Sequence, residues 1–357
     1  METFMDVEYL DIHKDLFDEI VEDIKQRNLS RNNMPKLIIG TGLSVIYGIP
    51  GMKELAGYLQ KEISKSKEDD LKKMWERHYD TIASKGLEIG LADLTPEEMV
   101  LVNKIKILTA EYILNSEEKL HAEILKRDTG FSRLLSYLSQ TVSVNKRMID
   151  IMTPNYDRII EIVCDKLGIG VITGFQGNLY SRFYRNLLKQ PTEFYNCRKK
   201  TWVRLFKPHG SINWICENNK EYLTNNYNVL REKTNCIEIV TPGSSKYEIS
   251  LTNNTFRTMR EDFNELLDME RQNSLLFYGY GFNDAHFDTV FLDSFQRNVL
   301  IIAKDVKPEI LEKALERKNI TVFYCEENKD YMIYKSKKYR CELPLWNIDQ
   351  FADVFLG

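Results

Sequence analysis

The stretch KLIIGTGLSVIYGIP, residues 36–50, indicates the fold class of this chain. Its first four residues, Lys36–Ile39, form a short apolar run that is typical of a buried strand. Gly40, Thr41 and Gly42 follow at once, and two glycines so close together mark a tight turn. A glycine-rich turn between a strand and a helix lets the backbone approach a pyrophosphate, although such turns also occur without a ligand.

Strands and helices alternate after residue 146. Short apolar runs at Arg147–Thr153, Val203–Phe206 and Leu275–Gly279 predict strands. Further short strands are predicted at Val171–Gly174, Ile237–Thr241, Val299–Ala303 and Thr321–Tyr324. This alternation predicts an α/β fold with a Rossmann-like, mostly parallel sheet, in which ligands bind at the carboxyl ends of the strands.

Two segments depart from that alternation. Apolar residues from Leu10 to Ile24 recur at helical spacing, which predicts an amphipathic helix. Residues 54–145 are rich in Lys, Glu and Leu and predict a large helical insertion. We therefore divide the chain into an N-terminal helical segment, 1–34, and an α/β domain, 35–357, that is interrupted by the insertion.

Composition narrows the class of protein. Apolar residues make up 43% and charged residues 29%, which is normal for a globular protein. A net charge of −4 argues against bulk attraction to nucleic acid or anionic lipid. The opening residues METFMDVEYLDIHKD lack the features of a signal peptide, so we expect a cytoplasmic protein. The six cysteines are scattered and form no C-x-x-C pair, which argues against a zinc cluster.

Polar residues follow three more of the predicted strands. Asn155 and Asp157 come directly after the strand that ends at Thr153, although both could simply cap a helix that begins at Arg158. His209 follows another strand, and histidine is a common general base.

The last of these strands ends in a glycine-rich loop. Gly279, Tyr280 and Asp284 follow it, where a plain turn is the alternative. Because the carboxyl ends of parallel strands meet at one edge, we expect all four loops to form one site.

The spacing of these motifs resembles that of the sirtuins. Residues 40–50, GTGLSVIYGIP, match the sirtuin pattern G-A-G-x-S followed by G-I-P. Residues 153–157, TPNYD, match T-Q-N-x-D, and His209–Gly210 match the family's H-G. Residues 279–281 fall where sirtuins have G-T-S.

The resemblance implies that NAD is the substrate and assigns roles to the motif residues. Asn155 would orient the ribose and a water, His209 would act as base, and Asp157 would position nicotinamide or ribose. The residues that would bind NAD are Gly40, Thr41, Gly42, Ser44, Gly48, Pro50, Thr153, Gly279, Tyr280 and Asp284. Of these, Gly40, Thr41, Gly42 and Ser44 would cradle the pyrophosphate, whereas Gly279 and Asp284 would border the adenosine half.

Departures from the sirtuin pattern indicate which branch the chain resembles. Residues 51–53, GMK, replace the acidic-aromatic-arginine triplet of the deacetylases, and the four zinc-binding cysteines after the H-G motif are missing, so we expect no metal. The phrase GYGFND, residues 279–284, and the helical insertion look more like bacterial sirtuin-like NADases of anti-phage defence. That resemblance implies an NAD+ glycohydrolase that releases nicotinamide and ADP-ribose and depletes NAD in abortive infection.

Two other functions remain open from the sequence. One is an NAD-dependent protein deacylase or ADP-ribosyltransferase that uses the same site. The other is a non-catalytic sensor or scaffold that binds NAD or ADP-ribose. The presence of both Asn155 and His209 argues against the second, since binding alone needs neither.

The resemblance also implies partners. We expect a homo-oligomer and a HerA-type ATPase, a DNA translocase, that docks on Leu10–Ile24 and Lys53–Asn145, unless those helices merely cover the sheet. The stretch Arg182–Lys207 holds eight Lys or Arg and one acid. It could be a nucleic-acid or partner surface, but a solvated basic face fits the acidic whole better. We therefore expect neither direct nucleic-acid binding nor membrane binding.

Overall fold

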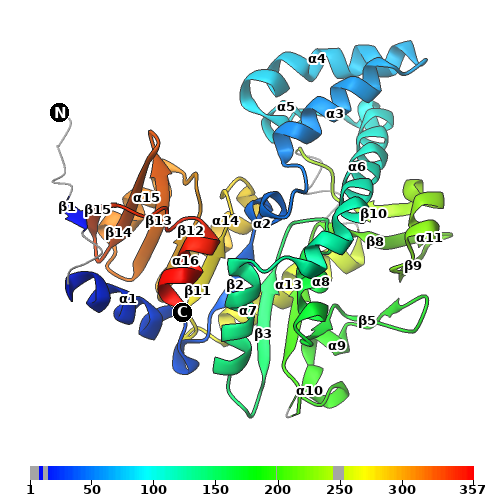
Figure 1. Ribbon diagram of the computed structural model, residues 1–357. Coiled ribbons are helices and arrows are strands. Elements are labelled where there is room, and N and C mark those ends of the chain that lie inside the picture. The colour runs from blue at the N-terminus through cyan, green and yellow to red at the C-terminus, as the bar shows by residue number, and fades with distance from the viewer. Residues whose placement is uncertain (1–7, 11–14, 198, 244–252) are drawn as a thin grey trace.

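A mostly parallel sheet forms the centre of the protein. The computed structural model describes residues 8–10, 15–197, 199–243 and 253–357 (Figure 1). Ten strands pair in the order β1-β15-β14-β13-β12-β11-β2-β3-β7-β4. Seven of them run parallel: β13 (Ile320–Glu326), β12 (Val299–Ile302), β11 (Leu275–Tyr278), β2 (Lys36–Ile39), β3 (Met148–Met152), β7 (Trp202–Phe206) and β4 (Gly170–Ile172). The expected Rossmann-like α/β fold is confirmed.

An antiparallel edge extends this sheet. It consists of β14 (Lys329–Tyr334) and β15 (Lys337–Cys341), with β1 (Glu8–Leu10) parallel to β15. The amphipathic helix expected from Leu10 was therefore placed too early. The backbone of Leu10 pairs with Cys341, and the helix α1 spans Asp15–Asn28, while residues 11–14 lie outside the described part of the chain.

Two small sheets lie apart from the large one. β10 (Ile237–Ile239), β8 (Gly210–Glu217) and β9 (Lys220–Leu223) form one, and β5 (Phe175–Gln176) and β6 (Arg182–Phe183) form the other. The strand predicted at Ile237–Thr241 exists, but it was wrongly expected in the parallel sheet. It pairs antiparallel with β8, which sequence patterning had not singled out as a partner.

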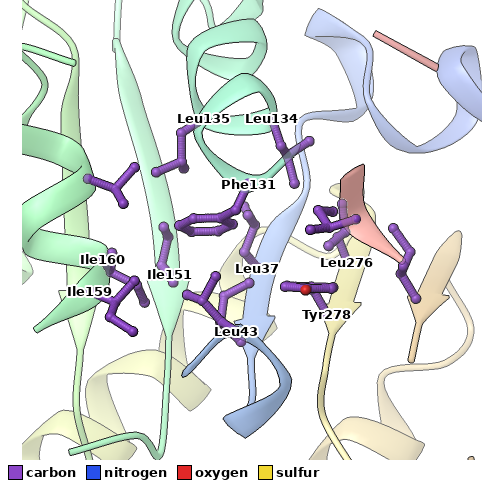
Figure 2. Packing of buried hydrophobic residues seen from close by; sticks show 14 of the residues in the cluster. Leu37, Leu43, Phe131, Leu134, Leu135, Ile151, Ile159, Ile160, Leu276 and Tyr278 are labelled. Atoms are coloured by element: carbon purple, nitrogen blue, oxygen red, sulfur yellow. The ribbon is translucent and has the colours of Figure 1, made fainter. Parts of the chain in front are cut away.

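Helices cover both faces of the large sheet. On one face lie α1, α7 (Gly130–Thr141), α8 (Ile159–Lys166) and α16 (Ile348–Phe355). On the other lie α9 (Asn186–Lys189), α13 (Asn254–Met269), α14 (Ala285–Asp293) and α15 (Pro308–Glu316). Figure 2 shows Phe131 and Leu134 of α7 packed against Leu37 and Tyr278 of the sheet. Fully buried strands covered on both faces explain why the strand sequences are continuously apolar.

The helices after β2 divide into two groups. These helices are α2 (Thr41–Ile46), α3 (Met52–Ser64), α4 (Asp69–Lys85), α5 (Leu87–Gly90), a 3-10 turn η2 (Pro96–Glu98) and α6 (Met99–Lys126). In Figure 1, α3, α4 and α5 project beyond the sheet, and they share a separate core with the start of α6 that includes Leu59, Trp75 and Leu101. The later part of α6, with Leu114, joins the core of the sheet together with α7. The helical insertion is thus present, and its last part covers the sheet.

Shorter helices complete the described chain. They are η1 (Arg31–Asn33), α10 (Pro191–Phe194), α11 (Tyr227–Glu232) and η3 (Thr234–Cys236). A search of the described residues finds no helix with the length and apolar character that a membrane span requires.

Candidate active site

Four loops meet at the carboxyl end of β2. From β2 the chain continues on one side to β3 and later returns on the other side as β11, so the strand order reverses at this point. Such a switch point is where open α/β sheets bind ligands. A pocket of about 870 Å³, part of which is open to solvent, lies there. We call it the Asn155 pocket; the loops after β2, β3, β7 and β11 line it with Thr41, Asn155, Asp157, His209, Tyr280 and Asp284.

Asn155 is held by one end of its amide and open at the other. Its side chain is buried, and Nδ2 donates to the carbonyl oxygen of Gly40 at 2.8 Å and to Ser44 Oγ at 3.1 Å. Because a carbonyl can only accept, these contacts fix which end of the amide is the nitrogen. Oδ1 has no hydrogen-bond partner among the described residues. An unpaired buried acceptor is unfavourable, so a ligand that donates to Oδ1 would stabilise this site.

Asp157 serves both the helix and the pocket. Oδ1 accepts the amide of Ile159 at 3.2 Å at the start of α8, so the capping role considered for Asp157 is real. Oδ2 accepts Ser44 Oγ–H at 2.6 Å and thereby ties the β2 loop to the β3 loop. Burial raises the pKa of Asp157, and the opposing effects of Lys207 and Ser44 only reduce that rise. Lys207 is itself fully buried and donates to the Asp157 carbonyl oxygen at 2.5 Å.

His209 lies beside a carboxylate from a different loop. Its Nε2 is 3.1 Å from Asp284 Oδ2. The structure places Asp284 beside His209, and its expected position at the adenosine half of NAD stays a prediction. In the loop that carries Asp284, the backbone turns at Gly279 and Phe282, which have positive φ angles of 56° and 52°. Sequence spacing could not reveal this turn.

The glycines of the β2 loop have a packing role. A Cβ on Gly40 would lie 2.3 Å from the Gly279 carbonyl oxygen, and one on Gly42 would lie 2.5 Å from Gly279 Cα. Their N–H groups donate to the carbonyls of Tyr278 and Gly279 at 2.9 and 3.0 Å. These two amides join the loops, and they are not free donors for the phosphates expected from the motif. Phosphate binding by Thr41 and its neighbours stays a prediction.

The other motif residues have distinct positions. Thr153 supports the β3 loop, since its Oγ1 donates to the Ile39 carbonyl at 2.7 Å and accepts the amide of Asn155. Gly48, at a φ of 85°, turns the chain toward Pro50, which lines the pocket. Tyr280 is buried and donates its hydroxyl to Asp288 at 2.9 Å.

A second hollow adjoins the Asn155 pocket. It encloses about 950 Å³, part of which is open to solvent, and we call it the Lys304 groove. Lys304 and Asp305 line it from the loop after β12, and Trp346 lines it from the segment before α16. Both hollows share Thr41, Tyr280, Gly281 and Asn283. The strand-end rule could have found Lys304 and Asp305, whereas no sequence signal points to Trp346.

The inserted helices also reach the Asn155 pocket. Leu55 of α3, Glu88 of α5 and Ile113 of α6 line it together with Met52. Sequence reasoning assigned none of these residues to the site, because nothing local places a helix of the insertion over the strand ends.

Several basic residues of the stretch Arg182–Lys207 pair with carboxylates. Arg185 Nη2 lies 2.6 Å from Asp262 Oδ1, and Lys189 Nζ lies 2.8 Å from Glu265 Oε2, both on α13. Arg204 pairs with buried Asp150 in the sheet. These contacts favour an ordinary paired surface over an open cationic one.

Comparison with known proteins is consistent with the site. Residues 150–323 match the SIR2-like domain. The match includes Asn155, Asp157, His209 and Asp284, and it supports a relationship to the Sir2-type family and an NAD-related activity. No curated protein matches the chain. Within the described ranges, no three His, Cys, Asp or Glu side chains are grouped so as to hold a metal ion.

Proposed function

We propose that this protein is an NAD+ glycohydrolase that cleaves the bond between nicotinamide and ribose. The observation that carries the proposal is the buried, unpaired Oδ1 of Asn155 in a pocket that also holds the His209–Asp284 pair. Simple nucleotide binding does not require a histidine with a carboxylate partner. The pairing fits a site that handles a proton.

The reaction places particular demands on the pocket. Breaking an N-glycosidic bond develops oxocarbenium character at the ribose C1′. Nicotinamide in NAD+ is already a cationic leaving group, so it departs with the bonding electron pair and needs no acid. The protein has to orient the ribose, stabilise positive charge and direct one water to C1′.

The residues of the Asn155 pocket can meet these demands. Oδ1 of Asn155 would accept a hydrogen bond from the ribose or from the attacking water, while Nδ2 stays bound to Gly40. His209 would take the proton of that water as it attacks C1′, and Asp284 would orient the imidazole. The carboxylates of Asp157, Asp284 and Glu88 line the same pocket and favour developing positive charge.

The Lys304 groove suits the remaining half of the substrate. NAD+ is too long for one compact pocket, and the two hollows meet at Thr41 and Gly281. We place the nicotinamide ribose in the Asn155 pocket, the pyrophosphate near Thr41 and the adenosine in the groove. Trp346 offers an indole face there, and Asp305 offers an acceptor for ribose hydroxyls.

Product analysis tests the proposed reaction directly. Purified protein incubated with NAD+ should yield nicotinamide and ADP-ribose in equal amounts, resolved by chromatography. An acetylated peptide and an acceptor protein serve as parallel substrates. Intact NAD+, or NAD+ consumed only when peptide is deacylated, would contradict hydrolysis, and stoichiometric zinc in untagged protein would support the deacylase alternative.

We further propose that NAD+ cleavage serves anti-phage defence and is controlled by self-assembly and by a HerA-type ATPase. The motif resemblance supports this role, and a free NADase would deplete its own host. Ile89, Met99 and Val100, near the junction of α5 and α6, are exposed apolar residues suited to such docking. Native mass measurement with and without the ATPase tests the idea; a fully active monomer that binds no ATPase would refute it.

A further inference from the structure

A buried carboxylate on the inserted helix α6 contacts the loop that carries Asn155. Glu117 has 0% exposed surface. Its Oε1 accepts Arg158 Nε at 2.8 Å and Arg158 Nη2 at 2.5 Å, and its Oε2 accepts the backbone N–H of Arg158. Tyr227 also donates its hydroxyl to Glu117, at 3.1 Å. A buried charge persists only when it is paired and hydrogen-bonded in this way.

Arg158 is the residue at which the Asn155 loop becomes helix α8. It follows Asp157 directly and precedes Ile159, the first residue of α8. Its guanidinium is also buried, lies 4.6 Å from the centre of the Tyr227 ring and donates to Asn225 at 3.2 Å. Glu117 thus binds both the backbone and the side chain of one residue. Such a double contact fixes the direction in which the chain leaves the loop.

Hydrogen bonds from the α/β domain also support the loop. Asn155 is bound to Gly40, and the carbonyl of Tyr156 accepts the amide of Ile212 at 3.0 Å. Glu117 differs because it reaches the loop from the insertion. Helix α6 has 28 residues, about 40 Å, and runs from the separate core of the insertion to the core of the sheet.

We propose that Glu117 is a positioning residue that holds the Asn155 loop in the shape that presents Asn155 and Asp157 to the pocket. Its effect on catalysis rests on the proposed NAD+ hydrolysis. The position of α6 against the sheet then determines the shape of the Asn155 loop, although α6 supplies no reacting group at this contact. The competing explanation is that the Glu117–Arg158 pair stabilises the fold and nothing more.

A matched pair of variants on α6 separates these explanations. Glu117→Gln keeps the size of the side chain and removes the charge that binds Arg158. Glu118→Gln removes a neighbouring carboxylate that pairs with the half-exposed Arg231 at 2.9 Å, away from the loop. We expect kcat for NAD+ cleavage to fall on the order of 100-fold in the first variant, because small misplacements of reacting groups have effects of that size. In the second variant, kcat should stay within about twofold of the wild type, since exposed ion pairs contribute little.

A double variant controls for stability. Glu117→Leu with Arg158→Met replaces the pair by apolar side chains of similar size, an exchange that can preserve or raise stability. We expect thermal unfolding close to that of the wild type together with the same low kcat, because the contact to the Arg158 amide is still missing. A double variant that recovers both stability and kcat would overturn the positioning role.

Hydrogen exchange tests the loop independently of hydrolysis. Peptides that cover residues 155–160 should exchange on the order of tenfold faster in Glu117→Gln than in Glu118→Gln. Unchanged exchange in Glu117→Gln would refute the proposal whether or not NAD+ is cleaved. If the wild type fails to cleave NAD+, the proposed function is wrong, and faster exchange would still show that Glu117 holds the loop.

Discussion

Strand β3 links two buried polar clusters that differ in how fully they are paired. In the middle of the strand, Asp150 Oδ2 lies 2.5 Å from Lys36 Nζ, and Oδ1 lies 2.6 Å from Arg204 Nε. Just beyond its carboxyl end, Asn155 Oδ1 has no partner among the described residues. The first cluster is closed on itself, and the second is open to a ligand.

The carboxylates of the two clusters also have pKa values shifted in opposite directions. Burial would raise the pKa of Asp150, but Arg204 and Lys36 outweigh burial and hold it well below the usual range. For Asp157 burial outweighs Lys207 and Ser44, so its pKa is raised. Buried polar groups normally have hydrogen-bond partners. Groups that lack such partners, or whose pKa values are shifted by burial, concentrate at functional sites. We therefore expect the closed cluster to contribute to stability and propose that the open one contributes to function.

The largest effect expected concerns activity at the open cluster. Asn155→Ala and His209→Ala should each lower kcat/KM for NAD+ cleavage by about 10²- to 10⁴-fold, the usual share of a positioned base and its partner. Stability should fall by no more than about 1–2 kcal/mol, the value of a few hydrogen bonds. Chromatography of products and urea unfolding measure both quantities. Near wild-type hydrolysis by either variant would show that its role is assigned wrongly.

The closed cluster should respond in the opposite way. Asp150→Asn leaves Arg204 buried without its carboxylate partner and leaves Lys36 with Glu270 alone, so the free energy of unfolding should fall by about 3–5 kcal/mol. Because the folded pKa of Asp150 is lowered, its contribution is present above the ordinary value of 3.8 and is lost as the pH falls. At a temperature where the variant stays folded, its kcat should remain within about threefold of the wild type. If Asp150→Asn instead lost much of its kcat while its stability stayed unchanged, the closed cluster would not differ from the open one in its role.

Sequence patterns were sufficient to predict the parallel part of the large sheet and the meeting of Asn155 and His209 at its edge, but not the strands β1, β14 and β15. Apolar runs such as 36–39 and 275–278 are continuous because both faces of a parallel sheet are buried. The polar residues after them must then meet at one edge, which is why the positions of Asn155 and His209 along the chain already assign them to one pocket.

Features that depend on contacts between residues far apart in the chain could not be predicted from the sequence. Glu117 resembles any other acid in a charged helical run, and its burial follows only from the docking of α6 against Arg158. The approach of Asp284 to His209, at 3.1 Å, joins two loops that are far apart in the sequence, and sequence spacing did not predict it. Leu10 was assigned to a helix because three-residue edge strands carry little pattern of their own.

A smaller loss of activity is expected when the partner of His209 is changed. Asp284→Asn keeps the shape of the side chain but removes the charge 3.1 Å from Nε2. We expect kcat to fall on the order of 10- to 100-fold, less than in His209→Ala, because the imidazole remains but is less firmly oriented. Asp293→Asn, at the exposed end of α14, serves as the matched control. Equal kcat values for these two variants would show that Asp284 does not contribute to catalysis through His209.

The smallest effect concerns Asp288, which extends the open cluster to the first turn of α14. It accepts the Tyr280 hydroxyl at 2.9 Å, and the effects of this hydrogen bond and of the charge of Lys307 on its pKa are smaller than that of burial. Burial, with a further contribution from the charge of Asp284, raises its pKa to about 6. The folded protein therefore holds this proton more tightly than the unfolded chain, so stability falls as the pH rises from about 4 to 6 and stays reduced above that range.

Asp288→Asn cannot ionise and should escape this loss. We expect the variant to be more stable than the wild type at pH 7.5 by about 2 kcal/mol, and equal to it near pH 4, where wild-type Asp288 is protonated. Urea unfolding at both pH values measures the difference. Asp150→Asn should instead show a nearly constant deficit between these two pH values, since the contribution of Asp150 is already present above its ordinary pKa of 3.8 and is lost only at lower pH. If both variants follow the same pH trend, the contrast between a closed and an open cluster on one strand does not hold.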